Sequence, residues 1–229
     1  MTRVGERVLV TGASRGLGQA LAVAFAREGA AVLGTGRDAA GLRRTAELCK
    51  GHAGEFMSAL LDVTMPDRVR ELVAEYDDLS VCVVNAGVAE VRPFAQTELE
   101  DLERLWQVDV AGAFVTMQAA AASMTRRRTG RIVVIASDAG YQGIARMAGY
   151  VAAKHALLGL CRTLALELEG TGVGLTVVCP GPIRTELLGD LAPGEGMDPD
   201  DVAALVVAAA ATTSTLAFVE LRLHGDARA

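Results

Sequence analysis

The chain has 229 residues, of which 51% are hydrophobic and 22% charged, and its formal net charge is −6. This composition excludes a disordered chain and provides enough apolar side chains for one large α/β domain, which we place over residues 1–229. The acidic excess argues against a nucleic-acid-binding protein, and the basic run TRRRTG (125–130) is typical of a solvated helix end.

The four cysteines, Cys49, Cys82, Cys161 and Cys179, form no CxxC pair, and no metal site is predicted. Cys82 and Cys179 lie in strand-like apolar runs, so we expect reduced, mostly buried cysteines, as in a cytoplasmic protein. The start of the chain leads into a strand, and the longest apolar run, VAALVVAAAA (202–211), is shorter than the ~20 residues that span a bilayer. We therefore expect neither a signal peptide nor a membrane contact.

Short β-rich runs alternate with helical stretches from end to end. The predicted strands are RVLVTG (7–12), AAVLGTG (30–36), EFMSALLDV (55–63), SVCVVNAG (80–87), GRIVVIAS (130–137), GLTVVCPG (174–181) and FVELRLH (218–224). The clearest helices cover 16–29, 98–128 and 150–169. Several strands are apolar on both faces, which is typical of parallel strands covered by helices on both sides. The pattern predicts a single-domain, Rossmann-type, doubly wound α/β sheet of about seven mostly parallel strands with helices on both faces.

The first strand ends in TGASRGLG (11–18), and a helix follows directly. Glycines at such a junction let the backbone pass close to a pyrophosphate, with the first N–H groups of the helix directed at it. Tight turns also need glycine, so a plain turn is the alternative. In this context we predict a dinucleotide-binding turn formed by Gly12, Ser14, Arg15, Gly16, Leu17 and Gly18.

The end of the second strand distinguishes NAD from NADP. In GTGRD (34–38), Gly36 stands where an acidic residue would accept a hydrogen bond from the ribose 2′-hydroxyl, and Arg37 follows it. Arg15 and Arg37 could bind a 2′-phosphate, or they could be ordinary surface arginines. Asp38 would be the hydroxyl acceptor if the strand ended later. We predict NADP(H) as the preferred cofactor, with NAD(H) possible.

Tyr150 and Lys154 are one helical turn apart, so their side chains share a face. A nearby ammonium stabilises a phenolate, which suits a group that gives a proton to a carbonyl oxygen during reduction. Taken alone, the pair is more typical of a packed ring beside a lysine that extends to solvent. Its meaning therefore depends on the other motifs of the chain.

Six motifs occur in order along the chain: TGASRGLG, LDV (61–63), NAG (85–87), GRIVVIAS, YVAAK (150–154) and PGPIRT (180–185). Together they resemble the short-chain dehydrogenase/reductase family over nearly the whole chain. The resemblance implies that Tyr150 is the catalytic acid/base, that Lys154 binds the nicotinamide ribose and tunes Tyr150, and that Ser137 hydrogen-bonds the substrate oxygen. It also implies a homodimer or homotetramer formed through the helices around 98–128 and 150–169.

The same resemblance assigns further contacts with the cofactor. Asp62 and Val63 match the pair that borders the adenine ring. The segment at the centre of the sheet, near the adenine ribose, corresponds to Asn85, Ala86 and Gly87. The loop that contacts the nicotinamide corresponds to Pro180, Gly181, Ile183 and Thr185.

The substrate side is predicted to be apolar. We expect it to be formed by Ala139, Tyr141, Ile144, Met147 and Leu187. A small flap over the substrate is expected from Leu187, Leu188, Leu191 and Met197.

The chain departs from the family at Asp109, in WQVDVAGAF (106–114), where an asparagine is usual. The main-chain carbonyl that supports a proton relay to Lys154 remains, but the side chain can now carry a charge. This carboxylate could raise the pKa of Lys154, or it could itself hold a proton. We therefore predict an active Ser137–Tyr150–Lys154 site with Asp109 as a modified fourth catalytic member.

The leading prediction is an NAD(P)H-dependent oxidoreductase that transfers a hydride between the nicotinamide and a carbonyl or secondary alcohol, such as a 3-oxoacyl compound or a hydrophobic ketone. The alternative is a catalytically weak NADP(H)-binding sensor, which Asp109 favours and the intact Ser137, Tyr150 and Lys154 oppose. An isomerase or epimerase that keeps its cofactor bound is a third possibility, although its extended relatives are usually longer. A small-molecule substrate and further copies of this chain are the expected partners.

Overall fold

The computed structural model of the chain describes residues 6–187, 196–211 and 218–223. Its centre is a seven-stranded parallel sheet in the order β3-β2-β1-β4-β5-β6-β7. The strands are β1 (Arg7–Thr11), β2 (Ala31–Gly36), β3 (Glu55–Leu60), β4 (Val81–Val84), β5 (Gly130–Ile135), β6 (Val173–Pro180) and β7 (Phe218–Leu223). All seven predicted strands are present, with ends that differ by a few residues, so the predicted α/β fold is confirmed.

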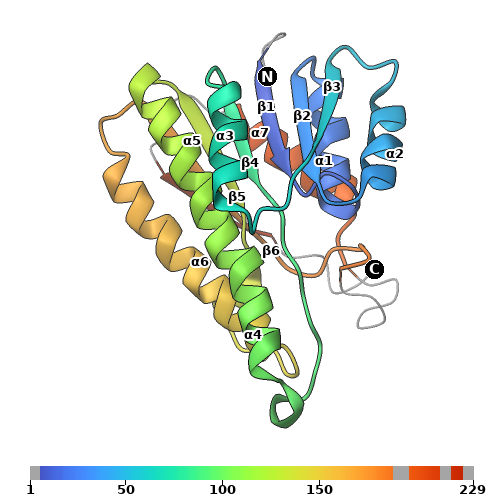
Figure 1. Ribbon diagram of the computed structural model, residues 1–229, viewed down its shortest axis with the longest axis vertical. Coiled ribbons are helices and arrows are strands. Elements are labelled where there is room, and N and C mark those ends of the chain that lie inside the picture. Colours follow the sequence, from blue (N-terminus) through green and yellow to red (C-terminus); the bar gives the residue numbers. More distant parts are fainter. Residues whose placement is uncertain (1–5, 188–195, 212–217, 224–229) are drawn as a thin grey trace.

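Helices cover both faces of this sheet (Figure 1). One face carries α1 (Gly16–Arg27), α2 (Ala39–Cys49) and α7 (Pro199–Ala210). The other carries α3 (Pro66–Glu75), α5 (Ala113–Arg127) and α6 (Ala148–Glu167), and α4 (Leu99–Trp106) leads into α5. The four cysteines are buried and free, as predicted. Within the residues that the structure describes, no helix has the length and apolar character needed to cross a bilayer.

The strands divide their side chains between two cores. In β1, Val8 and Val10 pack in the core beneath α1 and α7, whereas Leu9 packs in the core beneath α5 and α6. Val133 and Val134 of β5 separate in the same way, as the two-residue period of a strand requires. Because both faces are covered, these strands are apolar at nearly every position.

The strand order reverses between β1 and β4, which are neighbours although β2 and β3 lie between them in the sequence. The segments that follow them are joined, since Thr11 Oγ1 accepts hydrogen bonds from the N–H groups of Asn85 at 2.9 Å and Ala86 at 3.1 Å. Asn85 Nδ2 also donates to the Thr11 carbonyl at 2.9 Å. Ligands of open α/β sheets bind at the carboxyl ends of the strands beside such a reversal.

The helix predicted over 98–128 contains a wider turn. Residues Gln107–Gly112 form a π-helical segment between α4 and α5, and the chain then continues helically at Ala113. Gly112 packs so closely on Val63 that a Cβ at Gly112 would lie 2.8 Å from Val63 Cγ2. Such wide turns are frequent at functional sites, and this one contains Asp109.

Candidate active site

The carboxyl ends of the strands border a cleft of about 530 Å³. This volume lies within the range typical of small-ligand sites. The lining includes every residue predicted to contact the cofactor, together with the predicted catalytic residues Asp109, Ser137, Tyr150 and Lys154. The fold thus places the sequence motifs, from the glycine turn after β1 to the segment after β6, around a single cleft.

The glycine turn cannot accommodate ordinary side chains. Gly12 and Gly16 have φ angles of 73° and 54°, in the left-handed region that favours glycine. A Cβ at Gly18 would lie 2.1 Å from the Gly12 carbonyl oxygen. The Ala13 carbonyl accepts a hydrogen bond from Thr45 Oγ1 of α2 at 2.8 Å, which anchors the turn. The side chain of the N-cap residue Arg15 forms no capping hydrogen bond with α1, so the first N–H groups of this helix suit the phosphates of a dinucleotide.

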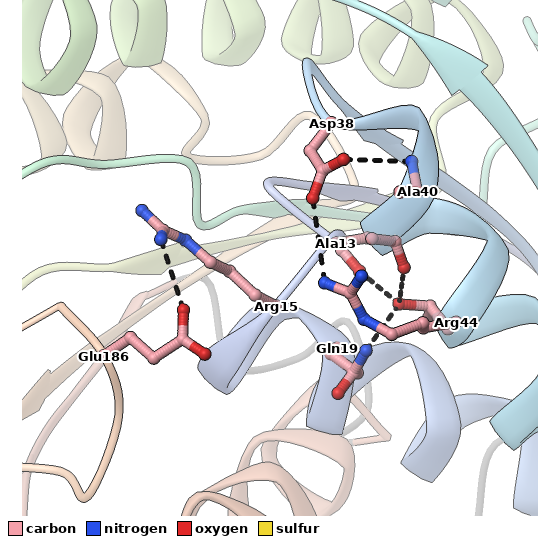
Figure 2. Close-up of polar contacts among 9 residues, drawn as sticks. Ala13, Arg15, Gln19, Asp38, Ala40, Arg44 and Glu186 are labelled. Carbon is pink, nitrogen blue, oxygen red and sulfur yellow. Dashed lines mark hydrogen bonds and ion pairs between the residues drawn. The ribbon is translucent and has the colours of Figure 1, made fainter.

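Asp38, at the end of β2, caps α2. Figure 2 shows its carboxylate directed at Ala40 and Arg44: Oδ1 accepts from Ala40 N at 2.9 Å, and Oδ2 lies 3.7 Å from Arg44 Nη2. The N–H of Gly41 contributes most to holding the pKa of Asp38 below its ordinary value. The carboxylate therefore already has local partners, and its use as a ribose acceptor would compete with them.

The two predicted phosphate-binding arginines each face a carboxylate. Arg15 Nη1 lies 3.3 Å from Glu186 Oε2 (Figure 2), and Arg37 Nη1 lies 3.6 Å from Asp62 Oδ2. Burial raises the pKa of Asp62, but hydrogen bonds from Thr64 and the charge of Arg37 outweigh burial, and the pKa is lowered overall. The arginine side chains are 61% and 66% exposed, so these ion pairs are weak and can be exchanged for another anion.

Ser137 and Tyr150 enter the cleft from the segments that follow β5. Ser137 precedes a short 3₁₀ turn (Asp138–Gly140), and its Oγ accepts a hydrogen bond from Ala139 N at 3.1 Å. Tyr150 lies in the first turn of α6, where it is buried and packs with Ala139. Lys154 Nζ lies 5.3 Å from the centre of the Tyr150 ring, so the helical spacing places the ammonium beside the phenol.

Asp109 and Lys154 form a buried ion pair. Asp109 Oδ1 lies 3.1 Å from Lys154 Nζ, and the two side chains are 0% and 6% exposed. Asp109 Oδ2 accepts a hydrogen bond from Val88 N at 2.9 Å. Gly87 makes room for the carboxylate, because a Cβ at Gly87 would lie 2.8 Å from Asp109 Oδ1. Burial by itself lowers the pKa of Lys154, but the charges of Asp109 and Tyr150 raise it overall, as in the first alternative that the sequence left open.

The end of β6 and the loop after it supply the predicted nicotinamide contacts Pro180, Gly181, Ile183 and Thr185, which all line the cleft. Ile183 forms a β-bridge with Met197, and Arg184 binds the Gly196 carbonyl at 2.6 Å and Asp198 Oδ2 at 2.7 Å. These contacts hold both ends of the expected flap together. Leu188 and Leu191 of that flap lie outside the described residues.

The substrate side differs from the prediction at two positions. Ile144, Met147 and Leu187 line the cleft, whereas Ala139 and Tyr141 do not. Ala139 is completely buried in the core that supports Tyr150. Tyr141 points instead toward β7, where its hydroxyl donates to Glu220 and the Arg222 guanidinium lies 3.5 Å from its ring centre. The 3₁₀ turn after Ser137 redirects the chain, so sequence proximity to Ser137 does not bring Tyr141 into the cleft.

Two carboxylates that the sequence analysis did not single out also line the cleft, Asp138 and Glu186. Asp138 Oδ1 accepts a hydrogen bond from Ser137 Oγ at 3.0 Å. Because Asp138 directly follows the predicted catalytic residue Ser137 in the sequence, its place in the cleft could have been predicted. Glu186 follows the PGPIRT motif and carried no comparable signal, because its contact with Arg15 joins segments far apart in the sequence.

Comparisons with known proteins agree with this arrangement. A family model described as short chain dehydrogenase matches residues 6–196. The ketoacyl reductase HetN of Nostoc sp. is 36% identical over 184 residues, which cover 79% of this chain and 64% of HetN, less than two thirds of its length. The 3-oxoacyl-acyl-carrier-protein reductase FabG of Escherichia coli is 32% identical over 184 residues, which cover 80% of this chain and 75% of FabG.

A solved structure extends the likeness to the fold as a whole. The alcohol dehydrogenase from the archaeon Thermococcus sibiricus, complexed with 5-hydroxy-NADP, matches with a TM-score of 0.86 at 29% identity and covers 95% of each chain. Because the family model spans most of the sequence and the fold agrees along nearly its whole length, this chain belongs to the short-chain dehydrogenase family, a family of NAD(P)-dependent oxidoreductases.

Proposed function

We propose that this protein is an NADP(H)-dependent oxidoreductase that interconverts a ketone or aldehyde and the corresponding alcohol. The observation that supports this proposal most directly is that Ser137, Tyr150 and Lys154 line the same cleft as the glycine turn. A dinucleotide bound along the turn can therefore share this space with a substrate that contacts the three side chains.

Each of these side chains has a distinct task. The bound nicotinamide supplies the hydride for reduction, or accepts it in the reverse direction. Tyr150 gives its hydroxyl proton to the substrate oxygen as the alcohol forms. Ser137 holds that oxygen through a hydrogen bond. Lys154, fixed by Asp109, stabilises the phenolate left on Tyr150 and binds the ribose hydroxyls.

The charges near the end of β2 support NADP(H) as the preferred cofactor. Arg15 and Arg37 line the cleft, and among the described residues they pair with exposed or partly exposed carboxylates, so a phosphate dianion can replace those partners. Asp38 is occupied by the cap of α2 and by Arg44. The solved relative with 5-hydroxy-NADP is consistent with this preference.

Arg37→Ala should raise KM for NADPH by about 10- to 100-fold, because a hydrogen bond between charged groups is lost, and it should change KM for NADH much less. Steady-state kinetics with both cofactors measures the effect. Arg68→Ala on α3, where an exposed arginine also pairs with a carboxylate, is the matched control. Equal changes in KM for NADPH and NADH would contradict the role of Arg37 in selecting NADP(H).

The substrate side favours a hydrophobic carbonyl compound, because Ile144, Met147, Ile183 and Leu187 provide apolar walls. The likeness to HetN and FabG makes 3-oxoacyl thioesters a second class to test. The deciding experiment follows NADPH oxidation with a panel of ketones, aldehydes and a 3-oxoacyl thioester. Binding of NADPH without turnover of any compound would contradict the proposed activity.

That outcome would return the cofactor-sensor alternative to consideration. Asp109 was the one feature in its favour, and the structure gives Asp109 a defined place against Lys154. Nothing in the described cleft disrupts Ser137, Tyr150 or Lys154, which a sensor does not need. We therefore do not adopt the sensor function.

An apolar surface on α4 and α5 supports assembly with further copies of this chain. This α4–α5 surface consists of Leu99, Leu102, Trp106 and Phe114, which are 38–65% exposed. Exposed apolar patches of this kind commonly mark protein interfaces. Trp106→Glu should shift the protein to a smaller assembly in multi-angle light scattering, whereas Leu48→Glu on α2 should not. The same mass for wild type and Trp106→Glu would contradict assembly through this surface.

A further inference from the structure

A carboxylate lies next to the side chain that would hold the substrate oxygen. Ser137 Oγ donates to Asp138 Oδ1 at 3.0 Å, and Asp138 Oδ2 accepts from Gln142 Nε2 at 3.3 Å. Asp138 also lines the cleft. The proton that Ser137 needs for a substrate carbonyl is therefore held by a charged, strong acceptor.

The described cationic groups of the cleft pair with other carboxylates and do not compensate the charge of Asp138. Lys154 pairs with Asp109 and Arg15 with Glu186, whereas Asp138 forms no ion pair in the part of the chain that the structure describes. Arg146 is exposed and is not among the residues that line the cleft. Among the described residues of the cleft, Asp138 is therefore a carboxylate beside Ser137 without a paired cation.

Binding of a carbonyl compound changes the hydrogen bonds of this group. When Ser137 donates to the substrate oxygen, Oδ1 of the half-buried Asp138 loses its donor, and an unsatisfied carboxylate oxygen is unfavourable there. A hydroxyl or ammonium group on the carbon next to the carbonyl can restore the lost hydrogen bond. A carboxylate at the same position would be repelled by Asp138.

We propose that Asp138 is a specificity-determining residue that selects carbonyl substrates with a hydroxyl or ammonium group on the neighbouring carbon and rejects those with a carboxylate there. The proposal rests on the proposed function of the cleft and narrows its substrate class. It assigns Asp138 no part in the transfer of hydride or proton.

The test compares NADPH-dependent reduction of three phenyl ketones that differ in the group next to the carbonyl. They are 2-hydroxy-1-phenylethanone, 2-amino-1-phenylethanone and phenylglyoxylate. For each variant, kcat/KM of the hydroxy or amino ketone is divided by kcat/KM of phenylglyoxylate. The ketones differ in intrinsic reactivity, but this difference cancels when the ratio of a variant is compared with that of wild type. We expect this ratio to fall by about tenfold or more in Asp138→Asn, which keeps the size of the side chain, and further in Asp138→Lys. A ratio within about twofold of wild type in both variants would overturn the proposal.

Asp67→Asn is the matched control, because Asp67 is an exposed carboxylate on α3, away from the cleft, and this variant should leave the ratio unchanged. If wild type reduces none of the three ketones, calorimetric titration of the NADP⁺-saturated protein with benzamidine and benzoate gives a second readout. Tighter binding of benzamidine in wild type, reversed in Asp138→Lys, supports the proposal, and the same order in both proteins overturns it. Charge-selective binding without turnover would then count against the proposed function and not against the role of Asp138.

Discussion

Replacing Tyr150 by phenylalanine is expected to lower kcat/KM for carbonyl reduction by about 10²- to 10⁴-fold, because the substrate oxygen loses its proton donor. The phenylalanine ring can keep the packing of Tyr150 against Ala139 and Met147, so the fold should be retained. Steady-state kinetics with NADPH measures the loss, and circular dichroism checks the fold. A folded variant that keeps more than about one tenth of the wild-type activity would show that another group supplies the proton.

Tyr141→Phe is the matched control for this experiment. Burial, together with the hydrogen bond to Glu220, raises the pKa of Tyr141 to about 12, and its hydroxyl points away from the cleft. The variant should therefore keep the wild-type kcat/KM. A loss comparable to that of Tyr150→Phe would mean that Tyr141 acts in catalysis, as its predicted place on the substrate side would allow.

The second large effect concerns stability. Asp109→Ala should lower the free energy of unfolding by about 3–5 kcal/mol, because it leaves the Lys154 ammonium buried without its counter-ion. The double variant Asp109→Leu/Lys154→Met should recover part of this loss, since neither buried charge remains. Urea unfolding followed by circular dichroism measures both variants. A double variant less stable than Asp109→Ala would exclude the uncompensated charge as the main cause.

The pair also predicts how stability depends on pH. Burial lowers the pKa of Lys154, but the charges of Asp109, Tyr150 and Cys161 outweigh burial and raise it above its ordinary value of 10.5. A group whose pKa is raised by folding stabilises the protein below its unfolded-state pKa, and this contribution is lost as the pH rises through the folded-state value. The stability difference between wild type and Asp109→Asn should therefore be full at neutral pH and decrease above about pH 10.

The same variant tests whether Asp109 influences catalysis. Where Lys154 stays protonated in this variant, its charge is no longer offset by the carboxylate and favours the phenolate that accepts a proton during alcohol oxidation. The pH–rate profile of alcohol oxidation should therefore move to lower pH in Asp109→Asn. An unchanged rate and an unchanged profile would limit Asp109 to a structural role.

Much of the site could be predicted because its motifs depend on short stretches of sequence. The glycine turn, the NAG segment and the spacing of Tyr150 and Lys154 each follow from local backbone or helical geometry. Strands that are apolar on both faces also predicted a sheet between two helical layers, and that topology brings the ends of distant strands together. These parts of the prediction needed no knowledge of long-range contacts.

The remainder depends on contacts and chain directions that no short pattern specifies. The 3₁₀ turn after Ser137 sends Tyr141 toward β7 and leaves Asp138 in the cleft. The prediction of one regular helix over 98–128 did not include the wide turn at 107–112, because the apolar residues of this turn are the same types that an α-helix would contain. The contact between Asp109 and Lys154 joins two separate helices, so its distance could not be deduced from either sequence segment.

The wide turn also limits how this chain can accept insertions and deletions. An α-helix rotates by roughly 100° per residue, so Trp106 and Phe114 would point about 80° apart in a regular helix. Each residue of a π-helical turn rotates the chain less, which brings these two exposed aromatic side chains closer to one line. Deleting one residue from 107–112 would turn Asp109 away from Lys154 and would also divide the α4–α5 surface. The wide turn therefore sets both the direction of Asp109 in the cleft and the alignment of the α4–α5 surface proposed for assembly. A change in its length would alter the two together.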